Sequence, residues 1–441
     1  MTPRVCCLAV LLAALPVCAA VPTVLAPAVA TPARVITLDE AYDIALATDQ
    51  SIRTAYWQIR MANLLPWSAL TLLGPQLSGG AEFDNNQKHP PGSVINTQNG
   101  SLNFAYTQPI MNFGVFPTYR YGKLVAQAAR LQEQYQIRQV LFGVASAYYQ
   151  VLTDQGMVEV DQKTVDLADE QLDVAQKRLD VGEVTPTDAL NARVTLESAK
   201  VALIQQQNTE LQDRDTLGNI LNLGGDTGFQ LVQPPDYPTT IPPFEKLLAI
   251  AYRDREDLEV ADLVIGEDIA KKGEVVAQYA PSIQGEVTDN YTNGNGLYGP
   301  QTQVWDANVS VSMPFFTGGQ REINLKTAGE QVEIDRLSRD TVVKTIEGNV
   351  RQAWLNARSL QESLGYLKVQ VDAARESYLD EQHEYEAGTA ASVDVLTALV
   401  ALNTSENSLA VKVYAYQVAL RDLEQVAGVF QQQRVLESKV K

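Results

Sequence analysis

The segment DANVSVSMPFF, residues 306–316, alternates polar and apolar side chains over most of its length. The polar positions are Asp306, Asn308, Ser310 and Ser312. The apolar positions are Ala307, Val309, Val311 and Met313. A period of two predicts an extended strand with two different faces. The segment LNFAYTQ, which contains Leu102 and Phe104, alternates in the same way.

Most of the remaining sequence is typical of long helices. Proline is absent from Thr118 to Thr185 and again after Pro314. Apolar residues recur at spacings of three and four, for example at Leu141, Val144 and Tyr148. A continuous helix over residues 118–181 would be about 95 Å long. Helices of this length predict coiled-coil packing, and alone they would fit a solvated structural coiled coil.

The chain is a tandem duplication. VGEVTPTDALNARVTL, from Val181, aligns with AGTAASVDVLTALVAL, from Ala387, at an offset of 206 residues, which is the spacing of Asp188 and Asp394. LDEAYDIAL aligns with FEKLLAIAY at the same offset, and QPIMNFG aligns with MPFFTGG. The predicted domains are a first repeat at 31–232, a proline-rich linker at 233–243, a second repeat at 244–430 and a tail at 431–441.

Each repeat has one predicted plan: a short helix, two strands joined by a polar loop, and a long helical hairpin. The predicted short helices are 38–62 and 244–276, and the predicted strands are 76–84, 101–108, 282–291 and 304–313. Gly182 and Gly388 interrupt the long helices, and glycine suits a helix C-cap. We therefore expect each interruption to be a hairpin tip.

The N-terminus predicts an export signal at residues 1–20, with cleavage possible as late as residue 30. All three cysteines lie in this leader, so the mature chain would contain none unless Cys18 is retained and lipidated. The formal net charge is −19, and no basic cluster suggests a nucleic-acid partner. No nucleophile elbow, phosphate-binding loop or metal-ligand spacing is visible, so we expect no enzyme activity, cofactor or metal.

The predicted strands are about the length that crosses a tilted bilayer, and four strands per chain are too few to close a barrel. An oligomer in which each chain supplies four strands would close one. The duplicated plan, the start LDEAYDIAL, the strand ends QPIMNFG and MPFFTGGQ, and both tips together resemble the TolC family of outer-membrane efflux proteins. The resemblance covers Leu38 to about Val429.

The resemblance implies a mostly α fold with β: a homotrimer whose long α-hairpins form an α-barrel tunnel beneath a shared 12-stranded transmembrane β-barrel. It implies an outer-membrane location extending into the periplasm of a Gram-negative bacterium. The implied function is the passive exit duct of a tripartite efflux or type I secretion system. Its partners would be outer-membrane lipid, a periplasmic adaptor and an inner-membrane pump of the RND or ABC type.

The resemblance also implies roles for individual residues. Lipid would contact Val309, Val311, Leu102 and Phe104, and the pore would be lined by Asp306, Asn308, Ser310 and Ser312. Trp305, Phe315 and Phe316 would lie near the membrane interfaces. The alternative reading is a soluble or lipid-anchored periplasmic coiled-coil protein with a structural or adaptor role.

At the tips, Asp394 matches a family aspartate that lines the periplasmic entrance. Asp188 and Tyr385 match residues that tie neighbouring hairpins together in the closed state. Thr397 stands where the family has a second aspartate, and Ala390 stands where it has an arginine. The tip residues expected to meet the adaptor are Gly182, Gly388, Val181 and Ala387.

Overall fold

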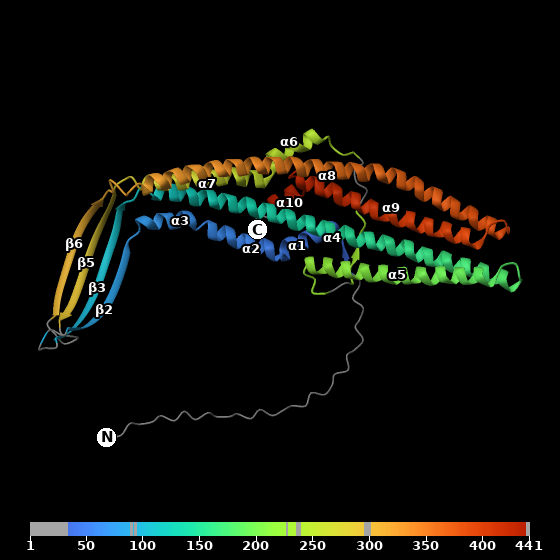
Figure 1. The fold of residues 1–441 in the computed structure, drawn as a ribbon, viewed down its shortest axis with the longest axis horizontal. Helices are drawn as coiled ribbons and strands as arrows, with labels where there is room; N and C mark the ends of the chain where they lie inside the picture. Colours follow the sequence, from blue (N-terminus) through green and yellow to red (C-terminus); the bar gives the residue numbers. More distant parts are fainter. Residues whose placement is uncertain are drawn as a thin grey trace, which may run out of the picture.

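The computed structural model describes residues 34–88, 91, 95–225, 228–234, 240–294 and 301–437. The predicted signal peptide, its cleavage sites and Cys18 lie outside the described residues. Figure 1 shows a four-stranded sheet at one end of an elongated molecule and two helical hairpin tips at the other. Within the described ranges, no helix combines the length and the apolar character needed to cross a membrane.

Both halves of the chain repeat the same order of elements. The first half contains α1 (Leu38–Thr48), α2 (Gln50–Ala62), α3 (Leu65–Leu70), the 3₁₀ turn η1 (Thr71–Leu73), α4 (Val115–Asp180) and α5 (Pro186–Ile220). The second half contains α6 (Phe244–Asp254), α7 (Glu256–Ala277), α8 (Gln320–Glu386), α9 (Ser392–Val426) and α10 (Gln432–Glu437). The last of these lies in the stretch predicted to be a tail.

The single short helix predicted at the start of each repeat is wrong, because each repeat has two helices there. Asp49 separates α1 from α2, and its carboxylate accepts hydrogen bonds from the Ser51 and Ile52 N–H groups. This side-chain cap stabilises a new helix start. Arg255 separates α6 from α7 at the corresponding position, with an extended backbone (φ −78°, ψ 124°).

The main sheet is antiparallel, with the strand order β2-β3-β5-β6. Its strands are β2 (Gln76–Lys88), β3 (Ile95–Met111), β5 (Ser282–Gly294) and β6 (Gln301–Ser312). The predicted strands ended too early on the side of the connecting loops. Residues beyond the predicted ends are mostly polar, so hydrophobic alternation could not identify them. Backbone pairing nevertheless continues, as far as Lys88 opposite Ile95 in the first hairpin.

Strand register divides the sheet into an apolar face and a polar face. Residues directly opposite one another across a ladder share a face. Phe104 is opposite Gly79 on one side and Asp289 on the other, and Asp289 is opposite Trp305. The apolar face carries Leu77, Phe83, Leu102, Phe104, Tyr106, Val287, Tyr291, Trp305, Val309 and Val311. The polar face carries Ser78, Glu82, Asn103, Thr107, Glu286, Thr288, Asp306, Asn308, Ser310 and Ser312.

Two further strands, which the sequence did not predict, form a small parallel sheet between β1 (Val35–Ile36) and β4 (Gln230–Leu231). The buried Tyr148 of α4 holds this sheet, because its hydroxyl donates to the Ile36 or Val232 carbonyl, at 3.0 and 2.6 Å. The same hydroxyl accepts from the Val232 N–H at 3.0 Å. Strands of two residues are too short to produce a recognisable alternation.

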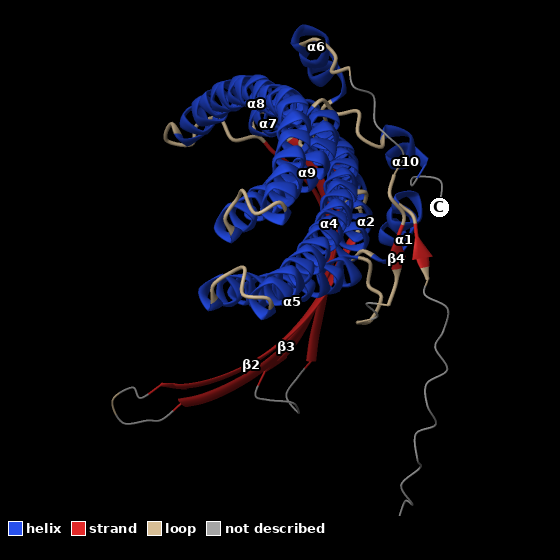
Figure 2. Cartoon of the chain, turned by 90° about the vertical axis from the view of Figure 1, so that its right-hand side faces the viewer, coloured by secondary structure: helices blue, strands red, loops and turns tan. Residues whose placement is uncertain are grey.

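The four long helices form an arc in the order α5, α4, α9, α8, which Figure 2 shows from the tip end. Each repeat supplies one antiparallel pair, and α4 packs against α9 where the two repeats meet. Helices α5 and α8 therefore lie at the two ends of the arc. Nearer the sheet, α7 lies between α4 and α8, and α2 and α3 pack on α4.

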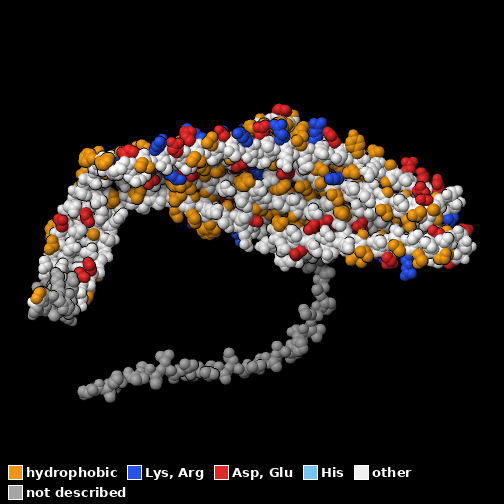
Figure 3. All heavy atoms as spheres, viewed as in Figure 1, with side chains coloured by type: hydrophobic (Ala, Val, Ile, Leu, Met, Phe, Trp, Pro, Cys, Tyr) orange, Lys and Arg blue, Asp and Glu red, His pale blue; other side chains and the backbone are white. Residues whose placement is uncertain are grey.

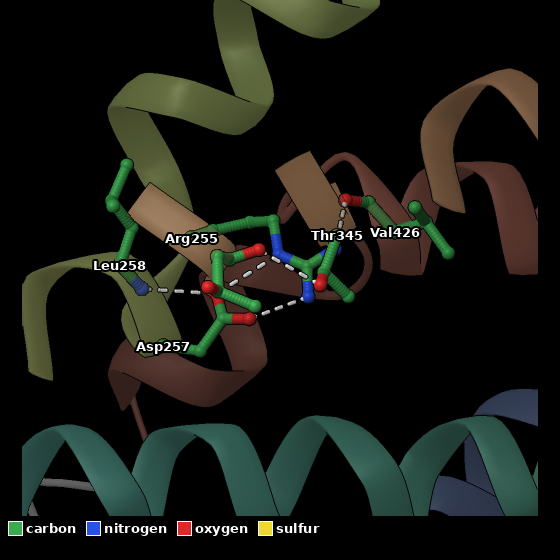
Figure 4. Close-up of polar contacts among 6 residues, drawn as sticks. Arg255, Asp257, Leu258, Thr345 and Val426 are labelled. Atoms are coloured by element: carbon green, nitrogen blue, oxygen red, sulfur yellow. Dashed lines mark hydrogen bonds and ion pairs between the residues drawn. The ribbon is translucent and has the colours of Figure 1, made fainter. Parts of the chain in front are cut away.

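The break between α6 and α7 is joined to the end of α9 (Figure 4). The Arg255 guanidinium binds both carboxylate oxygens of Asp257, at 2.9 and 2.7 Å, and donates to the Val426 carbonyl at 3.2 Å. Gly428 follows α9 with φ +78°, and a Cβ there would lie 3.1 Å from the backbone of Asp254. Glycine therefore permits both the left-handed turn and the close approach.

A buried ion pair connects the repeats above this junction. Arg138 of α4 and Glu256 of α7 are 4% and 6% exposed, and the guanidinium lies 2.5 Å from the carboxylate. The same guanidinium donates to the Phe430 carbonyl at 2.7 Å. One side chain thus contacts an element of the second repeat and the segment that follows α9.

We predict that Glu256→Ala destabilises the protein by about 3 to 5 kcal/mol, because the Arg138 charge would remain buried without its partner. Urea unfolding followed by circular dichroism measures the change. Lys163→Ala is the matched control, since Lys163 pairs with Glu159 on the exposed surface and should change stability by about 0.5 kcal/mol or less. Equal effects of the two substitutions would contradict a structural role for the buried pair.

Candidate functional site

The two hairpin tips have the same backbone structure. Gly182 and Gly388 adopt left-handed conformations, with φ of 79° and 77°. The Gly182 N–H donates to the Leu179 carbonyl at 2.9 Å, and the Gly388 N–H donates to the Tyr385 carbonyl at 3.0 Å. Glycine is favoured because other side chains are strained at positive φ. Each tip exposes its predicted adaptor-contact residues, including Val181 and Ala387.

Asp188 and Asp394 both cap the helix that returns from a tip. The Asp188 carboxylate accepts from the Thr185 N–H at 3.0 Å and from the Thr185 hydroxyl at 2.8 Å. The Asp394 carboxylate accepts from the Ala391 N–H at 3.2 Å. Ala391 has no hydroxyl, so Asp394 lacks the second bond that Thr185 gives to Asp188. The Asp394 carboxylate therefore accepts one hydrogen bond at its tip, whereas the Asp188 carboxylate accepts two.

Tyr385 is buried between the hairpins at 2% exposure. It belongs to an apolar cluster with Tyr378, Val395 and Leu399. The guanidinium of Arg178, on the other hairpin, lies 4.8 Å from the centre of the Tyr385 ring. It also donates to the Tyr385 and Glu386 carbonyls at 2.5 and 2.7 Å. A cation at the C-terminal end of a helix is stabilised by the exposed carbonyls there.

Arg178 is the tip residue that sequence reasoning missed. Its place in the last turn of a long helix was a weak signal, because cations are common there for local reasons. Its role depends on the second hairpin, whose tip lies beside it only in the folded chain. The family's tip arginine is absent at Ala390, whereas Arg178 gives the tips a basic contact from the opposite hairpin.

The structure does not bring all the predicted tip residues together. Within one chain, Asp188 is bonded to Thr185 of its own hairpin, and the Tyr385 carbonyl accepts from Arg178 of the other hairpin. Tyr385 is thus joined to the other hairpin of its own chain, whereas the closed-state ties predicted for Asp188 and Tyr385 stay predictions. The entrance-lining role of Asp394 and the adaptor contacts also stay predictions.

The predicted strand residues lie on the two faces of the sheet as the alternation indicates. Val309 and Val311 share the apolar face with Leu102 and Phe104. The four polar residues of the opening segment occupy the opposite face. Phe315 and Phe316, just beyond β6, are more than four-fifths exposed, at 87% and 83%. Such exposure is unusual for phenylalanine in water, and it indicates a surface that another apolar phase covers.

No group of three or more histidine, cysteine, aspartate or glutamate side chains in the described part of the chain could hold a metal ion. The candidate site is a set of surfaces at the two ends of the chain. It consists of a two-faced sheet at one end and two tips at the other, with an arc of helices between them.

This fold and this site are those of an outer-membrane channel built from long α-hairpins. A profile of the outer membrane efflux protein family matches residues 41–223 and 250–429. The chain belongs to that family, and its function is that of an exit channel for efflux or secretion, located in the outer membrane and extending through the periplasm.

Among curated proteins, the chain is similar to the alkaline protease secretion protein AprF of Pseudomonas aeruginosa. The two are 24% identical over 335 residues, which cover 73% of this chain and 68% of AprF. It is also similar to the outer membrane protein TolC of Salmonella enteritidis, with 24% identity over 387 residues, 82% of this chain and 76% of TolC.

Solved structures share the fold at lower sequence identity. The outer-membrane channel OprN is 18% identical, with a TM-score of 0.74 over 89% of each chain. The CmeC outer membrane channel of Campylobacter jejuni is 15% identical, with a TM-score of 0.74 over 91% of this chain and 89% of CmeC. These likenesses support the fold of both repeats.

We predict that Arg178→Ala loosens the tips, because it removes two carbonyl contacts and the contact with the Tyr385 ring. Hydrogen exchange should become faster at both tips, by about five- to thirtyfold for a loss of 1 to 2 kcal/mol. Lys177→Ala is the control, since Lys177 is exposed and pairs with Asp173 within its own helix. Unchanged exchange at the second tip would show that Arg178 does not hold the hairpins together.

Proposed function

We propose that three copies of this chain form one passive channel, in which three four-stranded sheets make a closed barrel of twelve strands. The observation that supports this most directly is the two-faced sheet with open edges at β2 and β6. Backbone groups at an unpaired edge cannot be satisfied in lipid. Pairing β6 of one copy with β2 of the next removes every edge, and closure needs several copies because four strands cannot close alone.

The helical arc supports the same assembly, because both of its ends carry exposed apolar rows. Figure 3 shows apolar side chains exposed along the helical body. On α5 the row is Leu190, Val194, Val201, Ile204 and Leu211. On α8 it is Ile323, Ile334, Leu337, Leu355, Tyr366 and Val369. The α5 row has spacings of three, four and seven, and the α8 row has spacings of three, eleven and eighteen, which are sums of three, four and seven. Such spacings keep residues on one helix face, so α5 of one copy would pack against α8 of the next.

In the trimer the apolar face of the sheet would contact lipid, and the polar face would line the pore. Val309 and Val311 are 69% and 65% exposed in the single chain, which is costly in water and favourable in lipid. The opposite face combines small polar side chains with Glu82, Glu286 and Asp306, which suit a water-filled passage. The alternative reading is a soluble coiled-coil protein. It does not account for a long sheet with an exposed apolar face.

The channel would be a passive duct without enzyme activity or cofactor, working with a periplasmic adaptor and an inner-membrane pump. The adaptor would contact the exposed tips around Val181, Gly182, Ala387 and Gly388. AprF is named for alkaline protease secretion, and the matched family is named for efflux. Both efflux and type I secretion therefore suit the proposed passage, with energy supplied by an RND or ABC pump.

Asp394 would form the acidic ring at the periplasmic entrance, with Asp188 close to it. Three-fold symmetry places three Asp394 carboxylates at one height. Carboxylates about 8 Å apart repel by roughly 0.5 kcal/mol per pair in water and about 2 kcal/mol at an effective dielectric constant of 20. The repulsion between the carboxylates favours opening of the entrance, and their negative charge attracts cations. Contacts such as that of Arg178 with Tyr385 would oppose the repulsion in the closed state.

The barrel proposal predicts that Val309→Arg impairs trimer assembly far more than Ser310→Arg. Arginine on the lipid face near mid-bilayer costs roughly 2 to 4 kcal/mol, whereas arginine facing a water-filled lumen costs much less. The two neighbouring positions form a matched pair, since both lie on β6 and differ in the face they occupy. Outer-membrane fractionation and detergent-resistant trimer on a gel provide the measurement. Equal tolerance at both positions would refute a membrane role for the sheet.

The gate proposal predicts that Asp394→Asn reduces cation selectivity and weakens block by a trivalent cation added at the tip side. Single-channel recording in a planar bilayer measures both effects. Thr397→Asp should strengthen the block, because it adds a second carboxylate one turn along α9. Asn retains the side-chain oxygen that caps the helix, so stability should change little. If block and selectivity stay at the wild-type level, Asp394 is a helix cap and nothing more.

A further inference from the structure

Polar side chains join the helices in the middle of the α-hairpins. One apolar cluster contains buried apolar residues of α4 between Ile137 and Leu152. The first buried residue of another cluster on the same helix is Ala168. Between them, the Asp161 carboxylate accepts from the amides of Asn403 and Asn407 of α9, at 3.1 and 3.0 Å. We call the stretch of α4 from Asp154 to Thr164, with its partners on α5 and α9, the polar waist.

The least expected member of the polar waist is Asp154, which is 3% exposed between α4 and α5. Gln206 of α5 donates to one of its carboxylate oxygens at 3.1 Å, and Gln150 of α4 donates to the other at 3.4 Å. The remaining neighbour is the carboxyl group of Asp213, also on α5, within hydrogen-bonding contact. Two carboxyl groups in contact can bond to each other only if they share a proton.

The duplicated helix pair packs without these two carboxyl groups. At the offset of 206 residues, Asp154 corresponds to Leu360 and Asp213 corresponds to Ala419. Helices α8 and α9 have bounds that match those of α4 and α5 at this offset on the tip side. Ala419 is buried in an apolar cluster, and Leu360 packs against it. The second hairpin thus fills the same position with an ordinary apolar contact, whereas the first hairpin keeps a titratable pair.

The surroundings of Asp154 favour the protonated form. Burial, followed by the hydrogen bond and the charge of Asp213, raises the pKa of Asp154 to about 7. The amides of Gln206 and Gln150 act in the opposite direction and do not compensate. The raised pKa places the change in the charge of Asp154 within the pH range to which a periplasmic protein is exposed.

Other charged groups also lie near the polar waist. On α5, Glu210 and Arg214 pair with each other at 2.8 Å, and the arginine also donates to the Phe229 carbonyl. On the far side of α4, a groove beside Gln150 contains Lys412 and Asp422 of α9, with Asn356 and Leu360 of α8 on its other wall. Asp213 is the charged group in contact with Asp154.

We propose that Asp154 and Asp213 form a proton-sharing switch that holds α5 against α4 while the shared proton is present and loosens this contact when the proton is lost. Ionisation would place two negative charges side by side at a buried helix interface. The repulsion is relieved when α5 moves away from α4 or when water enters between them. Because α5 carries the first tip at its N-terminal end, loosening at the polar waist would free that tip.

The direction of the pH effect follows from the raised pKa. Between the ordinary carboxyl pKa and about 7, the folded chain holds a proton that the unfolded chain releases. Raising the pH through this range therefore weakens the α4–α5 contact, and the weakening is complete above the raised pKa. The polar waist would be tight in acid and loose in mild alkali.

Distance measurement between two spin labels tests the proposal within one chain and does not depend on channel activity. Labels at Gln162→Cys and Ala202→Cys lie on α4 and α5 at exposed positions near the polar waist. The full-length chain would carry serine at its three cysteines, all of which lie at or before Cys18. We expect the distance distribution to lengthen or broaden as the pH rises from 5.5 to 8.5, with a midpoint near pH 7.

The second hairpin supplies a matched control. Labels at Lys368→Cys and Ser408→Cys occupy the corresponding positions on α8 and α9, where Leu360 and Ala419 replace the carboxyl pair, and their distance should not change with pH. Asp154→Asn should remove the pH response of the first pair and keep the distance at its acid value, because asparagine mimics the protonated acid. Asp213→Asn should move the midpoint to lower pH.

A double variant, Asp154→Leu with Asp213→Ala, copies the second hairpin and should also give a distance independent of pH. It keeps the test decisive if a buried asparagine alone disturbs folding. A wild-type distance that is the same at pH 5.5 and pH 8.5 would overturn the proposal. So would an unchanged pH response in Asp154→Asn, or an equal response from the control pair on α8 and α9.

Discussion

A β-sheet with open edges cannot remain in a lipid bilayer, because lipid offers no partner for unpaired backbone N–H and C=O groups. In this chain the edges are β2 and β6, and the sheet between them has one apolar face and one polar face. The rest of the molecule is consistent with that constraint. Helices α5 and α8 stand at the two ends of an arc and carry the apolar rows through which copies would associate.

Self-association then explains why the single chain leaves so much apolar surface exposed. The exposed side chains fall into two kinds with different proposed destinations. Those on the sheet, such as Val309 and Trp305, would contact lipid. Those on the helical edges, such as Val194 and Leu337, would be buried between copies. A soluble monomer would gain nothing from either kind, since each exposed apolar side chain sacrifices burial free energy.

The duplicated halves are most informative where they differ. Both tips use the same glycine turn, yet Thr185 gives Asp188 a second hydrogen bond that Ala391 cannot give Asp394. The last turn of the long helix in the first repeat contains Arg178, which reaches the carbonyl end of the corresponding helix in the second repeat. In each pair the two copies make different contacts at corresponding positions. The same holds at the polar waist, where one hairpin has carboxyl groups and the other has apolar side chains.

The sequence by itself determined the periodic features. Alternation predicted the two-faced strands, three-four spacing predicted the long helices, and self-similarity predicted two repeats with glycine tips. These features depend on neighbours along the chain, so local patterns reveal them. Only the tertiary structure decided that Arg178 lies against Tyr385, that Arg138 pairs with Glu256, and that Asp154 faces Asp213. Each of these contacts joins different helices, and Arg178–Tyr385 spans 207 residues. Their partners are chosen by packing, and the pattern around any one residue does not specify them.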